Sequence, residues 1–280
     1  MIDLHTHSLA SDGTDPPAVV AELAAAAGCR AVALTDHDTL VGVAPARARA
    51  AQLGVTLVAG CEVSCAFDGR SVHVLVYFVE PGDGPLQDEL VALRGDRVVR
   101  NRRLVGRLAE LGLPVAYDEV VAEAGDEEAV GRPHIAAVLV RKGLAESPGD
   151  AFDRWLGQGK PAYVPKARLS PAEVADLAAA SGGVAVLAHP LSLELAPPAL
   201  ERAVAELVEG GLGGLEALYA GYAPADRRAL RSLAARHDLV ATGGSDYHGT
   251  RNPDLSVGTG LGDLAVPDDV LDSLAARRPG

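Results

Sequence analysis

Short apolar runs alternate with alanine-rich stretches of helical character along most of the chain. Seven such runs are strand candidates, at residues 2–5, 31–35, 56–59, 72–78, 184–188, 214–219 and 240–242. Helical stretches lie between them, at residues 16–28, 44–54, 170–183, 201–211 and 225–237, and the first of these begins with two prolines and ends with a glycine. This alternation predicts repeated βα units around a parallel sheet. Seven strands with short connections favour a closed or nearly closed α/β barrel over an open sheet, but the pattern leaves closure open.

Residues 86–170 interrupt this alternation. Four stretches within them are typical of consecutive helices with no strand between, at residues 86–112, 117–125, 132–143 and 150–159. The segment holds 13 basic and 13 acidic residues, so the rest of the chain carries the whole net charge of −13. We therefore predict a barrel domain of residues 1–85 and 171–280 and a helical cap insertion of residues 86–170. A cap would cover the open end of the barrel, where sites form in such folds. Helices that only pad one barrel edge are the alternative.

Composition narrows the class of protein. With 48% hydrophobic and 22% charged residues, the chain of 280 residues is globular. No apolar stretch is long enough for a bilayer and the N-terminus lacks a signal pattern, so we expect a soluble, cytoplasmic protein that binds no membrane. The three cysteines (Cys29, Cys61 and Cys65) lack a CxxC spacing, which indicates reduced thiols. The negative net charge argues against a stable nucleic-acid complex. The sequence predicts no oligomeric state.

Histidines and acids gather at the predicted strand ends. In HTH, His5 and His7 lie two residues apart and share one face of an extended segment, and Asp12 follows in the loop. The later strands add Asp36 and His37, Glu62, His73, His189, and finally Asp246 and His248. His134 comes from the first turn of a helix in residues 86–170, and only His237 has the setting of a solvated surface residue.

Such a cluster of imidazoles and carboxylates would be costly to bury unless cations lie among its members. Imidazole with carboxylate suits Zn, Mn or Fe. The candidate ligands are His5, His7, Asp12, His37, Glu62, His73, His134, Asp246 and His248. Any one of them could be a satisfied core polar residue, but together they exceed what one ion needs and predict two or three ions. A centre that keeps net positive charge suits a phosphate dianion, so we predict in-line attack of hydroxide on a phosphomonoester.

The motifs HTHSLASDGT, ALTDHDTLVG, GCEVS, GRPHIA, AHP and GGSDYHG resemble, in order, those of the PHP family, named for its polymerase and histidinol phosphatase members. The resemblance runs through nearly the whole chain and implies an α/β fold, a distorted (β/α)7 TIM-like barrel with a trinuclear metal centre. It implies that His5, His7, Glu62 and Asp246 hold one ion, that Glu62, His73 and His134 hold the second, and that Asp12, His37 and His248 hold the third.

The helical segment, with RNRR, GRPHIA and AFDRWLGQGKPAYVPK, looks closest to the branch that acts on nucleoside 3′,5′-bisphosphates. This implies a small phosphorylated nucleotide as substrate: removal of the 3′-phosphate of pAp to give AMP, and trimming of short oligonucleotides from the 5′ end. A histidinol-phosphate phosphatase, an amidohydrolase and a non-catalytic metal-binding module are the alternatives. The amidohydrolase is disfavoured because no barrel-strand lysine is available.

Several further residues are candidates for catalysis and substrate binding. Arg132 can fork onto phosphate oxygens, and Lys166 is a second candidate cation. His189 is expected to contact the substrate phosphate or to protonate the leaving oxygen, and Asp246 counts among the catalytic residues. Arg97 and Asn101 lie four apart on one helix face, which suits a second phosphate or a base. The alternatives are a helix-end charge for Arg132, a packed strand-end imidazole for His189, and a solvated surface for Lys166, Arg97 and Asn101.

Overall fold

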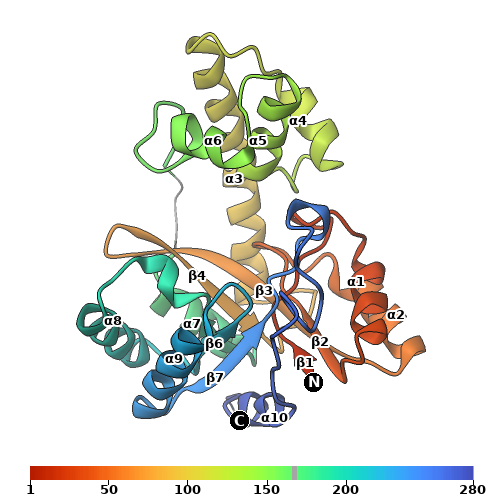
Figure 1. The fold of residues 1–280 in the computed structure, drawn as a ribbon, viewed down its shortest axis with the longest axis vertical. Coiled ribbons are helices and arrows are strands. Elements are labelled where there is room, and N and C mark those ends of the chain that lie inside the picture. The colour runs from red at the N-terminus through yellow and green to blue at the C-terminus, as the bar shows by residue number, and fades with distance from the viewer. Residues whose placement is uncertain (166–168, 280) are drawn as a thin grey trace. The chain divides into compact units, whose positions relative to one another are not determined.

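The computed structural model describes residues 1–165 and 169–279. Its chain divides into two compact units, one formed by Met1–Leu90 with Arg168–Gly280 and the other by Val91–Ala167. Figure 1 shows the strands of the first unit and the helices of the second. The role of residues 86–170 as a cap stays a prediction.

The first unit is built on one seven-stranded sheet in which the strands follow one another in chain order. They are β1 (Ile2–Asp3), β2 (Ala31–Leu34), β3 (Thr56–Phe67), β4 (Arg70–Tyr77), β5 (Val184–Leu187), β6 (Gly214–Tyr219) and β7 (Val240–Gly244). All seven predicted strands are confirmed. Alanine, valine and leucine recur in most of them, and most of the strand side chains are buried, so the apolar runs form the centre of the unit.

The two ends of the sheet meet, which makes a nearly closed barrel. Just after β1, the Leu4 amide donates to the Gly243 carbonyl at 3.1 Å, and beyond β7 the Asp246 amide donates to the His5 carbonyl at 2.8 Å. The approach needs glycine, because a Cβ on Gly244 would lie 2.4 Å from the His5 backbone nitrogen. The contacts bring the residues after β1 beside those after β7. The predicted barrel fold is confirmed.

The prediction of an all-parallel sheet is wrong at β4. This strand runs antiparallel to both β3 and β5, whereas the remaining neighbours are parallel. β3 and β4 form a hairpin whose turn residues, Asp68 and Gly69, both have positive φ, at 46° and 71°. Such a turn matches the twist of a hairpin, and Asp-Gly is its favoured sequence. As a result Glu62 lies in the middle of β3 and not, as predicted, at its end.

Helices surround the sheet, mostly where the sequence predicts them. They are α1 (Pro17–Ala26), α2 (Val43–Leu53), α7 (Pro171–Ala180), α8 (Pro197–Glu209), α9 (Pro224–Arg236) and α10 (Asp269–Ala275), with short 3₁₀ turns η2 (Pro190–Leu193) and η3 (Gly249–Arg251). Among the residues that the structure describes, no helix combines the length and the apolar character needed to cross a bilayer. All three cysteines are buried free thiols.

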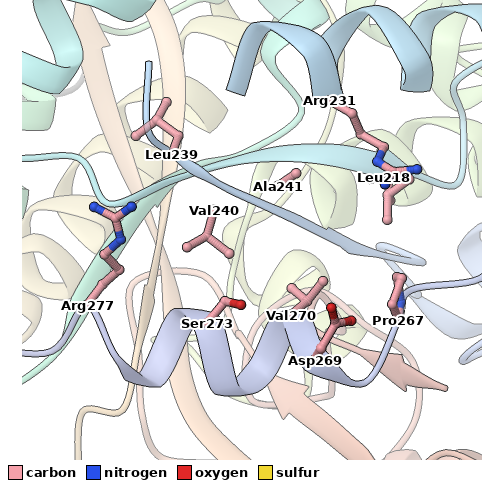
Figure 2. A pocket seen from close by; sticks show the side chains of 10 residues that line it. All are labelled: Leu218, Arg231, Leu239, Val240, Ala241, Pro267, Asp269, Val270, Ser273 and Arg277. Atoms are coloured by element: carbon pink, nitrogen blue, oxygen red, sulfur yellow. The ribbon is translucent and has the colours of Figure 1, made fainter. Parts of the chain in front are cut away.

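Helices α9 and α10 flank a pocket beside β6 and β7 (Figure 2). Its volume is about 330 Å³, and it is lined by Leu218, Arg231, Leu239, Val240, Ala241, Pro267, Asp269, Val270, Ser273 and Arg277. The pocket is open, and the Arg277 guanidinium is already paired with Asp238. Among the described residues, no predicted site residue lines this pocket.

The second unit is helical. Helix α3 (Pro85–Glu110) begins in the first unit and continues into the second. It is followed by α4 (Tyr117–Ala124), α5 (Arg132–Arg141), α6 (Pro148–Ala151) and the π-helical turn η1 (Phe152–Leu156). Residues 91–165 contain no strand, as predicted. Leucines, valines and alanines of these helices form a core of their own, around Leu104, Leu108, Ile135, Leu139 and Leu156.

Candidate metal centre

The segment after β1 supplies two histidines to the inside of the barrel. His5 and His7 are both fully buried, and their Nε2 atoms lie 3.1 Å apart. The His7 amide donates to the Tyr247 carbonyl at 2.9 Å, so the extended segment runs beside the chain that leaves β7. The two-residue spacing therefore points both rings to the same place, as predicted from HTH.

Glu62 on β3 lies at the centre of the imidazoles and is 1% exposed. Its Oε2 atom is 3.3 Å from His5 Nε2, 3.2 Å from His7 Nε2 and 3.2 Å from His37 Nδ1. Its Oε1 atom is 2.8 Å from His73 Nδ1. His73 pairs with Ser64 across the hairpin, two residues from Glu62, so both side chains point to one face of the sheet. One carboxylate thus contacts four rings, which come from β4 and from the exits of β1 and β2.

Two aspartates face the same imidazoles from other sides. Asp246 Oδ1, just after β7, lies 3.2 Å from both His5 Nε2 and His7 Nε2. Asp12 Oδ1 lies 3.3 Å from His248 Nε2, 3.8 Å from His37 Nε2 and 4.0 Å from His7 Nδ1. Each aspartate therefore presents one oxygen to a group of ring nitrogens.

These atoms form three overlapping groups whose donors lie within 4.8 Å of one another. They are His5, His7, Glu62 and Asp246; His7, Asp12, His37 and His248; and His37, Glu62 and His73. Eight of the nine predicted ligands thus lie together at one end of the barrel. Their assignment to particular ions stays a prediction.

The donor set fits divalent cations. His7 Nδ1 and Asp12 Oδ1 are buried and have no hydrogen-bond partner among the described residues, and such orphan atoms call for one. His248 Nδ1 lies 2.8 Å from the Asp246 carbonyl, to which it can only donate, so Nε2 keeps its lone pair. Neutral imidazoles and carboxylates together suit Zn, Mn or Fe.

The electrostatics of the cluster also call for positive charge. Burial opposes ionisation of Glu62 and Asp246, yet the surrounding histidines hold the pKa of both carboxyls well below the usual range. Burial likewise opposes the charge of His7, but hydrogen bonds with Asp246 and Glu62 raise its pKa to about 10. Burial lowers the pKa of His37 to about 3. Protons on some rings therefore balance the acids here, and divalent cations can replace those protons.

The backbone is strained where it delivers these groups. Asp246 has φ 54° and His189 has φ 24°, both in the left-handed region that non-glycine residues rarely adopt. Such residues persist only where their surroundings hold them, and they cluster at functional sites. At this end of the barrel, they mark the exits of β5 and β7.

His189, predicted to contact substrate, lies against the cluster but in none of the three groups. Its Nε2 atom is 2.9 Å from Glu62 Oε1, and its Nδ1 atom is 3.0 Å from Ser192 Oγ. The ring also meets Tyr219 edge-on, with centroids 5.8 Å apart. His189 is therefore within reach of whatever the cluster binds, and its role in catalysis stays a prediction.

Three residues of the site had no predicted role. Asp36 accepts from the Ser8 amide, the Ser8 hydroxyl and the Ser11 hydroxyl, at 2.7, 2.7 and 2.6 Å, and so fixes the loop that carries Asp12. Tyr219 donates to Asp246 Oδ2 at 2.8 Å. Glu216 is fully buried on β6. A charged residue inside the apolar run GLEALY was the available signal for Glu216.

The predicted residues of the second unit lie as follows. Arg97 and Asn101 are 6% and 0% exposed, so the alternative of a solvated surface is wrong for both. Asn101 Nδ2 donates to the Val130 carbonyl at 2.7 Å and ties α3 to the segment before α5. The Arg132 guanidinium lies near the rings of Phe152 and Tyr163, at 5.6 and 5.9 Å. Their substrate roles stay predictions, and Lys166 lies outside the described residues.

His134 caps its own helix. Its Nδ1 atom accepts from the Gly131 amide at 2.9 Å, so in a neutral ring the proton lies on Nε2. A metal ligand needs the opposite arrangement, with a lone pair on the binding nitrogen and a proton on the other. Ligation through Nε2 would therefore require this cap to open, and the role of His134 as a ligand, which the family resemblance implies, stays a prediction.

Comparison with known proteins places the chain in a family. The model of the PHP domain matches residues 3–121. A 3′,5′-nucleoside bisphosphate phosphatase of Chromobacterium violaceum is 32% identical over 88% of this chain and 87% of its own length. A 5′-3′ exoribonuclease of Haemophilus influenzae is 33% identical over 88% and 89%. The crystal structure of a candidate metal-dependent phosphoesterase from Bifidobacterium adolescentis has a TM-score of 0.87 and 33% identity, covering 100% of this chain and 96% of that one.

The chain belongs to the PHP family, as its motifs indicate. It is a metal-dependent hydrolase of phosphoric esters.

Proposed function

We propose that this enzyme removes the 3′-phosphate from a nucleoside 3′,5′-bisphosphate such as pAp, giving AMP and phosphate. One observation carries the proposal: three carboxylates and the imidazoles around them converge at one end of the barrel, in three groups able to hold cations. Similarity to a nucleoside bisphosphate phosphatase over most of both chains supports the substrate class. Similarity to a 5′-3′ exoribonuclease supports short oligonucleotides as further substrates.

Metal ions bound there, two or three of Mn, Fe or Zn, would neutralise phosphate oxygens and activate water for attack on phosphorus. His5, His7, Glu62 and Asp246 would hold one of them, with Asp12, His37 and His248 at a second position. Glu62 has the contacts to serve more than one position, since Oε1 and Oε2 face different rings. His73 would join Glu62, with His134 as its predicted partner.

The remaining residues orient the phosphate ester and manage protons. His189 would hold a proton at Nε2 and give it to the ribose 3′ oxygen as the bond from phosphorus to that oxygen breaks. Ser192, 3.0 Å from Nδ1, keeps the ring in place. The Tyr219 hydroxyl donates to Asp246 Oδ2, so only Oδ1 of that carboxylate faces the cluster. These residues would place the leaving oxygen beside His189.

The test is phosphate release from a panel of substrates before and after treatment with a chelator. We expect chelation to abolish turnover of pAp and added Mn²⁺ to restore it, and we expect kcat/KM for pAp to exceed that for histidinol phosphate. Turnover that survives removal of all metal would refute the metal chemistry. Preference for histidinol phosphate would overturn the substrate class and leave the phosphoesterase assignment standing.

Short 5′-phosphorylated oligonucleotides complete the panel. Release of mononucleotides from the 5′ end would extend the activity to phosphodiesters, which the similarity to an exoribonuclease favours. Binding of Mn²⁺ with no turnover of any phosphate ester would instead favour the third candidate, a non-catalytic metal-binding module.

A further inference from the structure

Glu216 is a buried acid that the proposed chemistry does not use. It lies on β6, is 0% exposed, and pairs with no lysine or arginine of residues 1–165 or 169–279. A carboxylate in such a place needs hydrogen-bond donors for both of its oxygens. The structure supplies one donor to each oxygen, and both donors belong to residues of the metal cluster or its border.

The first donor is a ring nitrogen. His5 Nδ1 lies 2.9 Å from Glu216 Oε1. Because a carboxylate oxygen only accepts, the ring proton lies on Nδ1. The other nitrogen, Nε2, then keeps its lone pair and faces Glu62 Oε2 at 3.3 Å and Asp246 Oδ1 at 3.2 Å. Glu216 thereby selects the tautomer of His5 that a cation requires and fixes the orientation of its ring.

The second donor is a backbone amide. His189 N donates to Glu216 Oε2 at 2.6 Å. This amide belongs to the residue with φ 24°, a conformation that persists only when neighbouring groups hold it. The short bond to a fixed carboxylate on the adjacent strand is such a restraint. This bond fixes the backbone of His189, and therefore the position from which its ring extends toward Glu62.

We propose that Glu216 is a positioning residue that joins the two halves of the site: through Oε1 it prepares His5 to bind metal, and through Oε2 it holds His189 in its strained conformation. The two contacts come from opposite oxygens of one side chain, so Glu216 couples metal binding to the placement of His189. This inference rests on the proposed function for the role of the metal.

Glu216→Gln separates this role from simple packing. Glutamine has nearly the same shape but only one accepting oxygen, so its NH₂ group must face either the His5 Nδ1 proton or the His189 amide. Leu215→Ala is the matched control. Leu215 is the preceding residue of β6, is equally buried and points to the other face of the sheet, so its truncation lowers stability without touching the site.

In the experiment, the full-length, metal-free proteins are titrated with Mn²⁺. The concentration of unbound Mn²⁺ is measured by electron paramagnetic resonance. We expect Glu216→Gln to bind Mn²⁺ about 10- to 100-fold more weakly than the wild type. Leu215→Ala should bind like the wild type despite a lower melting temperature. With Mn²⁺ saturating, kcat of Glu216→Gln for pAp should stay about tenfold or more below wild type at nearly unchanged KM, because His189 is displaced.

The outcomes are distinct. If the wild type binds no Mn²⁺, the metal centre fails and this role fails with it. If the wild type binds and Glu216→Gln matches it in affinity and kcat, the metal centre stands and the role of Glu216 is wrong. Loss of affinity in Leu215→Ala equal to that in Glu216→Gln would assign both effects to stability. Should Glu216→Gln not fold, Glu216→Asp keeps two accepting oxygens on a shorter arm, and wild-type affinity in that variant would also overturn the proposal.

Discussion

Charged side chains have opposite environments in two regions of the molecule. One region is the end of the barrel that carries the three donor groups, called here the barrel mouth, and the other is the second unit, called here the helical unit. At the barrel mouth, Glu62 is 1% exposed and meets imidazoles on all sides. In the helical unit, several basic side chains pair with acids in solvent, as Arg102 does with Glu127, whose exposed fractions are 58% and 41%. Lys142 with Glu119 and Arg154 with Asp150 follow the same pattern.

The difference distinguishes charges that serve a binding site from charges that only keep the surface in water. Buried charges without exact partners are expensive, and they persist where a ligand or a reaction uses them. Exposed pairs cost little and contribute little. These exposed pairs of the helical unit therefore need no functional explanation, whereas the acids of the barrel mouth call for cations. Substitutions in the two regions should differ in effect by orders of magnitude.

The largest expected effect is that of Glu62→Gln. The glutamine amide has only one accepting oxygen. Its NH₂ group replaces an oxygen that contacts imidazoles in the wild type. Since bound metal supplies several kcal/mol of transition-state stabilisation, kcat/KM for pAp should fall by about 1,000-fold or more. Elemental analysis should find less metal per chain. Glu127→Gln, an exposed acid of the helical unit, is the matched control, and equal losses in both variants would contradict the contrast drawn between the regions.

The strand exits could be predicted because their chemistry follows from local order. Parallel strands end at one edge, so His5, His37 and Asp246 had to converge if the apolar runs were neighbouring strands. Glu216 and Asp36 were harder to assign, because their roles depend on partners 25 to 211 residues away. Burial of such an acid can be suspected from sequence, but the partner that justifies it comes only from the fold.

The antiparallel β4 and the buried Asn101 illustrate a second limit. FDGRS contains the Asp-Gly pair of a hairpin turn. The pattern of βα repeats nevertheless predicts a parallel strand at this position. For Arg97 and Asn101, a spacing of four fixes a shared helix face but not what packs on that face. Only tertiary contacts, such as that of Asn101 with Val130, distinguish a buried face from a solvated one.

The next effect tests whether the helical unit has an independent core. Leu139 on α5 is fully buried among apolar neighbours of that unit, so Leu139→Ala should lower the free energy of unfolding by about 2–5 kcal/mol. Because the three donor groups of the barrel lie in another unit and the substitution leaves the His134 side chain unchanged, Mn²⁺ binding per folded chain should be close to that of the wild type. Calorimetry with a parallel Mn²⁺ titration measures both. Loss of metal affinity at temperatures where the chain is folded would show that the two regions are not separable.

A smaller change is expected at the border of the metal cluster. Burial and the charge of Asp246 hold the pKa of Tyr219 well above its ordinary value, so the hydroxyl stays a donor to Asp246 at neutral pH. Tyr219→Phe removes a hydrogen bond to a charged group, worth about 1.5–3 kcal/mol, and should lower kcat about tenfold. Tyr247→Phe is the control, because Tyr247 makes the same kind of bond to Asp15, outside the three groups. An equal loss in both variants would assign the effect to general tyrosine packing.

The smallest effect should come from the exposed pair of Arg102 and Glu127. A double-mutant cycle with Arg102→Ala and Glu127→Ala should give a coupling free energy below about 1 kcal/mol, and less at high salt. Arg102→Ala alone should cost more than this coupling, because the guanidinium also lies 4.4 Å from the centre of the Tyr117 ring. Neither variant should change metal content or kcat. A coupling of several kcal/mol would mean that charge in the helical unit is as strongly constrained as at the barrel mouth, and the contrast between the two regions would then have to be abandoned.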